Sequence, residues 1–219
     1  MIDLTRFATA LLMIGGFSNL ALAEQRCESY FFEASPGDQF RSATVIGKES
    51  SRIYFHDRGE MCPAEGCRRD TYLVPGDRLL TNQTNDDWVC VYFKDVGKAP
   101  VIGWLPKKQL NIVTPNPHPD LDAWLGNWAN DRSRLHIGLG PKSGTVAVYG
   151  TAHWGDGPAP HTGSVEGTAM PLGNQIRIED GACKINLSLV GEWLIAADNS
   201  RCGGLNVTFT SVYGKDQHR

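Results

Sequence analysis

The residue types best suited to chemistry gather in one stretch, 152-AHWGDGPAPHTG-163. His153, Asp156 and His161 lie within nine residues of one another, and two imidazoles with a carboxylate can hold a metal ion or transfer protons. The glycines and prolines between them predict instead a long, exposed hairpin loop that presents Trp154 and its neighbours to a partner. Three interpretations therefore stand: a plain surface loop, a recognition loop, or a metal or catalytic site.

Other signs of catalysis are missing from the sequence. There is no Gly-x-Ser-x-Gly motif, and all six cysteines can pair with one another, which leaves no thiol as a nucleophile. Cys62 and Cys67 are loosely spaced like zinc ligands, but no second CxxC or HxxxH follows them. We therefore expect no cofactor and no bound metal, and we favour a protein that is not an enzyme. An envelope hydrolase that uses His153, Asp156 and His161 is the alternative.

The start of the chain predicts export. Arg6 precedes an apolar run from residue 7 to 22 that ends in Ala21-Leu22-Ala23, the pattern of a signal peptide over residues 1–23. Glycines and polar residues interrupt this run, so we expect no membrane span. The expected location of the mature protein is periplasmic or secreted.

Six cysteines, an even number in an exported chain, predict disulfides. Cys183 and Cys202 stand alone in the C-terminal half, and their bond would contribute ~3 kcal/mol by the chain-entropy model. The four others allow three connectivities, of which we favour Cys62 with Cys67 and Cys27 with Cys90.

Charge excludes one class of partner. The formal net charge is −3, and lysine and arginine are scattered along the chain, so the positive field that gathers phosphates is absent. We do not expect nucleic acid as a partner.

Prolines divide the chain into two parts of similar size. Three prolines between residues 115 and 119 predict a stiff linker over residues 114–120, with domains at 24–113 and 121–215. Neither part holds a long amphipathic helical pattern, and both show short alternating runs separated by turn residues, which predicts an all-β fold. The expected strands are 52–56, 72–74, 77–83, 88–93, 101–105, 134–139, 145–154, 163–169, 175–179, 184–189, 193–197 and 205–213.

The segment 72-YLVPGDRLLTNQTNDDWVCVYFKDVGKAPVIGWLPKKQL-110 resembles the last two thirds of a bacterial SH3-like domain, and 52-RIYFHDRGE-60 is similar to the opening strand of an exported variant. The matching positions are Tyr72, Gly76, Asp77, Trp88, Val91, Gly103, Trp104 and Leu110. The chain departs from the family in lacking an Asn-Val-Arg run and in an enlarged loop that holds Cys62 and Cys67. The resemblance implies an N-terminal SH3-like barrel over residues about 52–113.

In the C-terminal half, 124-WLGNWANDRSRLHIGL-139 is similar to the opening of lipocalin- and avidin-type barrels, in which a tryptophan closes one end. This similarity implies a C-terminal antiparallel β-barrel or meander. Leu205, Val207, Phe209 and Val212 are expected to point inward from its last strand.

Binding is the function that these patterns favour. Trp104 is interpreted either as a core residue or, with Tyr54 and Tyr92, as part of an exposed aromatic face of the kind that binds peptides. The second expected contact surface is the loop with His153, Trp154, Asp156 and His161. We expect a periplasmic binding protein that recognises another protein or the peptidoglycan, in one form as an inhibitor of, or immunity protein against, a cell-wall hydrolase.

Overall fold

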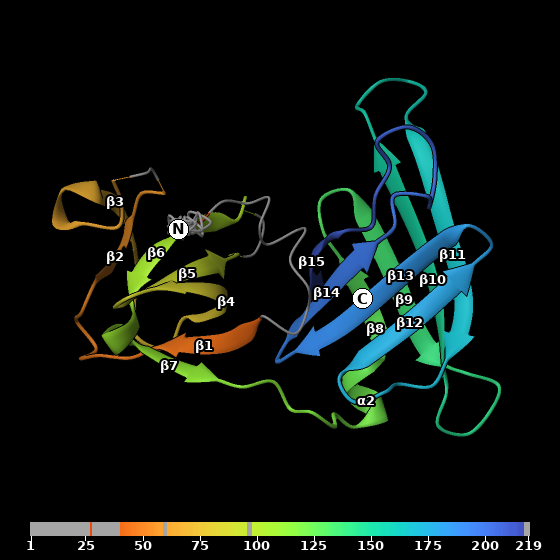
Figure 1. Cartoon of the computed structure of the whole chain (residues 1–219), viewed down its shortest axis with the longest axis horizontal. Coiled ribbons are helices and arrows are strands. Elements are labelled where there is room, and N and C mark those ends of the chain that lie inside the picture. Colours follow the sequence, from red (N-terminus) through yellow and green to blue (C-terminus); the bar gives the residue numbers. More distant parts are fainter. Residues whose placement is uncertain (1–26, 28–39, 59–60, 96–97, 217–219) are drawn as a thin grey trace, which may run out of the picture.

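The computed structural model describes residues 27, 40–58, 61–95 and 98–216. The expected signal peptide lies outside these residues. The described chain is almost entirely β, and it forms two sheets that lie side by side (Figure 1). The expected all-β fold with two barrels is confirmed.

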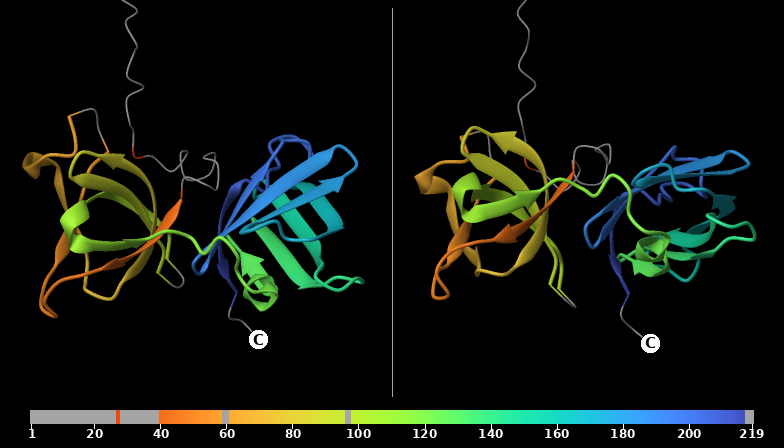
Figure 2. Two further views of the ribbon diagram at one scale, coloured as in Figure 1. Left: turned by 60° about the horizontal axis from the view of Figure 1, so that its bottom comes forward. Right: turned by 90° about the horizontal axis from the view of Figure 1, so that it is seen from below.

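The first sheet holds seven antiparallel strands in the order β3-β2-β6-β5-β4-β1-β7. The strands are β1 (Arg41–Val45), β2 (Ile53–His56), β3 (Arg68–Leu73), β4 (Arg78–Asn85), β5 (Trp88–Phe93), β6 (Val101–Pro106) and β7 (Leu110–Val113). Two short 3-10 turns, η2 (Glu65–Cys67) and η3 (Lys107–Gln109), connect them. The sheet curls around a core that includes Phe55, Leu79 and Leu105. Figure 2 shows this curl.

Two local predictions in the first barrel are confirmed. Gly76 has φ +98°, a conformation that side-chain-bearing residues rarely adopt, and the Asp77 carboxylate beside it accepts a hydrogen bond from the Val74 N–H at 2.8 Å. At Gly103, a Cβ would lie 2.8 Å from the His56 carbonyl oxygen, so only glycine permits this close approach of β6 to β2.

The second sheet holds eight strands in the order β11-β10-β9-β8-β15-β14-β13-β12. The strands are β8 (Gly126–Ala129), β9 (Ser133–Leu139), β10 (Val146–Trp154), β11 (His161–Ala169), β12 (Gln175–Asp180), β13 (Cys183–Val190), β14 (Trp193–Asp198) and β15 (Ser211–Lys215). Strands adjacent in sequence are adjacent in space, and β15 returns to β8, so the strands run up and down around a nearly closed barrel. Between β11 and β12 the Glu166 N–H donates to the Asp180 carboxylate at 3.0 Å.

Strand alternation fills the second barrel. Along β10 the buried residues occur at every second position, and the same period holds in β9 and β12. A four-residue helix, α2 (Leu121–Trp124), precedes β8, and both Trp124 and Trp128 are buried in the barrel core. The Trp128 indole N–H donates to the Trp124 carbonyl oxygen at 2.8 Å.

One predicted strand is mostly wrong. The segment expected as a strand over 205–213 pairs only from Ser211 onward, and Leu205 is 70 % exposed rather than inward. The reason is local: the Asp198 carboxylate and the Thr208 hydroxyl accept hydrogen bonds from the backbone N–H groups of Phe209 and Thr210, which a ladder partner would otherwise take. Val207 and Phe209 are buried as expected.

All three favoured disulfides are present: Cys27–Cys90, Cys62–Cys67 and Cys183–Cys202. Bonds of this kind form and persist in an oxidising environment. Within the described ranges, no helix is long and apolar enough to cross a membrane.

A third cluster of buried residues joins the two barrels. From the first barrel it takes Phe40, Leu80, Tyr92, Ile102, Trp104 and the Cys27–Cys90 bond, and from the second Val190, Trp193, Ile195 and Val212. The Trp193 ring meets the Tyr92 ring edge to face at 5.8 Å. We call this set the junction core. Because these side chains are buried and almost entirely apolar, their contact holds the outer faces of β14 and β15 against β5 and β6.

Tyr213 on β15 gives the fold a dependence on alkaline pH. Its hydroxyl lies 2.6 Å from the Ser133 hydroxyl and donates to the Phe209 carbonyl oxygen at 2.7 Å, and its ring is fully buried. Burial raises the pKa of Tyr213 well above its ordinary value of 10.0. The folded state therefore keeps the phenol proton where the unfolded state loses it. The stability from this group is complete below about pH 10 and falls as the pH rises above that value.

We expect Tyr213→Phe to lower the free energy of unfolding by about 1 kcal/mol at pH 7, because one buried hydrogen-bonding group is lost. Between pH 9 and pH 11 the variant should lose less stability than the wild type. Urea unfolding across this range measures both effects, and equal alkaline losses in the two proteins would contradict the assignment to Tyr213.

Candidate functional site: the cleft between the barrels

A cleft of about 220 Å³ opens where the two barrels meet, beside the junction core. Strands β5 and β6 form its wall on the first barrel. The second barrel contributes the β8–β9 turn, the end of β10 and the segment that leads into β15. Of the residues that the sequence predicted for binding, this cleft brings together Tyr92, His153 and Trp154.

The predicted loop residues divide between two faces of the β10–β11 hairpin. Trp154 is paired directly with His161, and their rings meet edge to face at 5.8 Å. His153 is paired with Thr162, one position away, so its side chain leaves the opposite face of the ladder. Asp156 lies exposed in the loop beyond both. This register separates the two imidazoles, which disfavours their joint use on one substrate or one metal ion.

No group of three or more His, Cys, Asp or Glu side chains that could hold a metal ion occurs among the described residues. The hairpin tip carries exposed side chains instead. Trp154 is 39 % exposed, which leaves much of its indole available to a partner.

The entrance of the cleft carries an ion pair between the barrels. The Lys94 ammonium from the end of β5 lies 3.0 Å from the Asp131 carboxylate in the β8–β9 turn. Asp131 is largely exposed, so the pair adds little stability, but it sets opposite charges at a defined place on the rim.

The β8–β9 turn forms a polar wall. The Asn130 side-chain oxygen accepts hydrogen bonds from the backbone N–H groups of Arg132 and Ser133, both at 2.8 Å. Its amide nitrogen is buried, and the Asn130 side chain also interacts with the buried Tyr213 hydroxyl. Asn130 therefore fixes the turn from the interior of the barrel.

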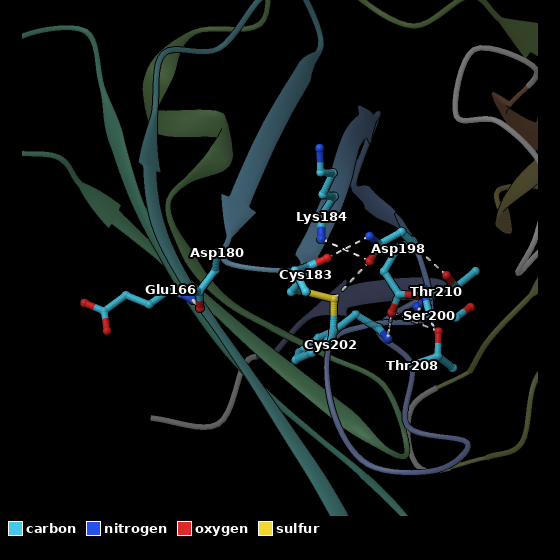
Figure 3. The surroundings of a disulfide bond; sticks show 12 residues. Glu166, Asp180, Cys183, Lys184, Asp198, Ser200, Cys202, Thr208 and Thr210 are labelled. Carbon is cyan, nitrogen blue, oxygen red and sulfur yellow. Dashed lines mark hydrogen bonds between the residues drawn. A yellow bond between two sulfur atoms is a disulfide. The ribbon is translucent and has the colours of Figure 1, made fainter.

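The opposite wall is the loop that connects β14 to β15, and Figure 3 shows how it is held. The Asp198 carboxylate accepts hydrogen bonds from the Ser200 N–H at 2.7 Å and the Thr208 hydroxyl at 3.0 Å, besides that from Phe209. Cys202 ties the start of the loop to Cys183 at the beginning of β13. The loop also bridges to β11 through Gly203 and Gly163, and these contacts together hold it beside the cleft.

The hypothesis of an exposed aromatic face made of Tyr54, Tyr92 and Trp104 is wrong. Trp104 is 0 % exposed because its ring fills the junction core, and Tyr92 is nearly buried there with it. Tyr54 lies elsewhere on the first barrel, where its ring stands 5.7 Å from that of Tyr72. Two sheets pack face to face at the junction, so outward-facing aromatics of β5 and β6 become core residues.

Sequence reasoning missed Lys94, Asn130 and Asp131 as parts of the site. Strand alternation places Lys94 on the same face as Tyr92, a signal that was present in the sequence. Asn130 and Asp131 carry no such signal, since they have the composition of an ordinary turn.

Comparison of the chain with protein-family models, with curated proteins and with solved structures finds no match. Its fold and disulfides define the chain as a disulfide-stabilised protein of two β-barrels joined through a common buried cluster.

Proposed function

We propose that this chain is a non-enzymatic binding protein of the periplasm or the extracellular space, which recognises another protein through the cleft between its barrels. The observation that carries the proposal is the cleft itself, because it unites Tyr92, His153 and Trp154 from distant segments. In this proposal the SH3-like resemblance of the first barrel concerns its fold, and the binding surface belongs to both barrels.

The side chains around the cleft support a protein partner. The cleft supplies a partly exposed indole, which is typical of the centre of a protein interface, and a pair of opposite charges, which is typical of its periphery.

The first experiment tests one form of this function, the inhibition of a cell-wall hydrolase. The disulfide-bonded protein is mixed with lysozyme and labelled peptidoglycan. Slower lysis supports inhibition, and pelleting with the wall would assign the peptidoglycan as the partner instead. Release of label without lysozyme would overturn the proposal in favour of a hydrolase.

Single substitutions then test the site, with the partner identified in that assay. Trp154→Ala is expected to weaken binding at least about tenfold, since exposed tryptophans at interface centres contribute ~2 kcal/mol or more. His153→Ala should weaken it by a smaller factor. Tyr149→Ala is the matched control, because Tyr149 is 52 % exposed on the same strand but does not line the cleft. Binding unchanged in both cleft variants, with circular dichroism showing an intact fold, would show that the site is elsewhere.

A further inference from the structure

Four side chains form a continuous strip on the outer face of β2 and β3, on the first barrel and separate from the cleft. The Arg68 guanidinium carbon lies 4.0 Å from the centre of the Tyr54 ring, the Tyr54 and Tyr72 rings are 5.7 Å apart, and the Arg52 guanidinium carbon lies 4.6 Å from the Tyr72 ring. We call this set the arginine–tyrosine strip. Tyr54 and Tyr72 are directly paired across the two strands, which is why both rings share one face.

The two guanidinium groups of the strip are suited to binding an anion. Within the described ranges, neither Arg52 nor Arg68 makes an ion pair, whereas the neighbouring Arg69 pairs with Asp57 at 3.7 Å. Stacking on a tyrosine ring fixes the plane of a guanidinium and leaves its N–H edge directed outward, the geometry that holds a carboxylate by two hydrogen bonds. One exposed carboxylate, that of Asp70, lies between Arg68 and Tyr72 on β3 and partly offsets the two cations.

The strip lies on the edge of a sheet. In the described chain β3 is hydrogen-bonded to β2 alone and ends the strand order, and Figure 1 shows it at the outer side of the first barrel. An unpaired edge strand presents backbone N–H and C=O groups that another extended segment can pair with. The strip spans about four residues of an extended chain at ~3.3 Å per residue. Two acidic residues four positions apart on such a chain share a face and can reach both arginines.

We propose that this edge is a docking site for an extended acidic polypeptide segment, which pairs with β3 and places carboxylates against Arg52 and Arg68. The partner is identified by charge and conformation: no described carboxylate pairs with either cation, and an open strand edge can pair with an extended segment. This site is independent of the cleft, so either can fail without the other.

The test uses two labelled nine-residue peptides of the same Thr, Val and Glu composition. In one the two glutamates are four positions apart, on one face of a strand, and in the other they are three apart, on opposite faces. The first peptide should bind the disulfide-bonded protein more tightly in fluorescence anisotropy, and its binding should weaken as salt screens the charges. Hydrogen exchange should slow at the backbone amides of residues 68–73.

Matched double variants separate a local site from general charge. Arg52→Gln with Arg68→Gln is expected to weaken binding about tenfold, since two partly exposed ion pairs are lost. Arg177→Gln with Lys184→Gln removes the same charge from exposed positions on the second barrel and should change binding less than about twofold. Asp70→Asn should strengthen binding, because it removes an exposed carboxylate next to the strip in β3.

The proposal would be overturned by equal losses of binding in the two double variants or by equal affinity for the two peptides. Binding only to a carboxylated polysaccharide offered at the same charge would also overturn it. Slower exchange without a difference between the peptides would also count against it, since the arginines would then take no part.

Discussion

Replacing Cys27 and Cys90 together by alanine should lower the free energy of unfolding by about 4 kcal/mol, the largest loss expected from any of the three disulfides. This bond joins residues 63 positions apart, so it restricts the unfolded chain more than the bonds that span 19 and 5 positions. Both cysteines are also fully buried in the junction core, where alanine leaves a cavity.

Urea unfolding of the three double variants measures this order. Removal of Cys183–Cys202 is expected to cost about 3 kcal/mol and removal of Cys62–Cys67 about 2 kcal/mol on the same model. The prediction is contradicted if the Cys62–Cys67 variant loses as much stability as the Cys27–Cys90 variant. Binding at the cleft is a second measurement. Only loss of the Cys183–Cys202 bond should directly loosen the β14–β15 loop that forms one wall of the cleft.

Trp193→Ala should destabilise the protein by about 3–5 kcal/mol, the range for truncating a large buried aromatic residue. Trp193 contributes its ring to the junction core from β14 and contacts Tyr92 of β5, so its removal opens a cavity between the barrels. We therefore expect the barrels to separate in solution, with a larger radius of gyration in X-ray scattering and weaker binding at the cleft.

Arg78→Gln is the control for this prediction. It removes the ion pair of 2.8 Å between Arg78 and Glu192, which also crosses the junction but is exposed at both ends. The expected loss is at most about 0.5 kcal/mol, because exposed ion pairs contribute little. If the two substitutions had similar effects, surface charges rather than apolar packing would hold the barrels together.

The junction core thus connects stability to the proposed function. Its residues fix β5 and β6 against β14 and β15, and the cleft lies directly beside them. A binding site made of two barrels exists only while this contact holds. The arginine–tyrosine strip lies within one hairpin and should survive its loss, so the two sites can be tested separately in the Trp193→Ala variant.

Local patterns predicted local features well. Alternation in 145–154 and 175–179 predicted β10 and β12, and the turn residues Gly76 and Asp77 have the expected roles. Failures occurred where side chains compete with the backbone: in 205–210 the Asp198 carboxylate and Thr208 hydroxyl replace ladder partners. A sequence window that ends before residue 198 or begins after it cannot reveal this competition.

The candidate site was only partly predictable, because several of its features depend on segments that lie far apart in the chain. Trp154 and His153 were selected because a loop rich in glycine and proline presents side chains. The pairing of Tyr54 with Tyr72 depends on strand register, and the burial of Trp104 depends on contact with a second barrel. The hydrophobic period of one strand specifies neither its register with a neighbouring strand nor its contact with another barrel.

The sequence by itself determined the all-β class, because the strand period and the turn residues recur along the chain, and it favoured the three disulfide pairings that the structure contains. Only the tertiary structure decided which outward faces became the junction core, where the cleft opens, and that His153 and His161 lie on opposite faces. These features depend on register and on packing between segments far apart in the chain, where one residue of shift moves a side chain to the other face.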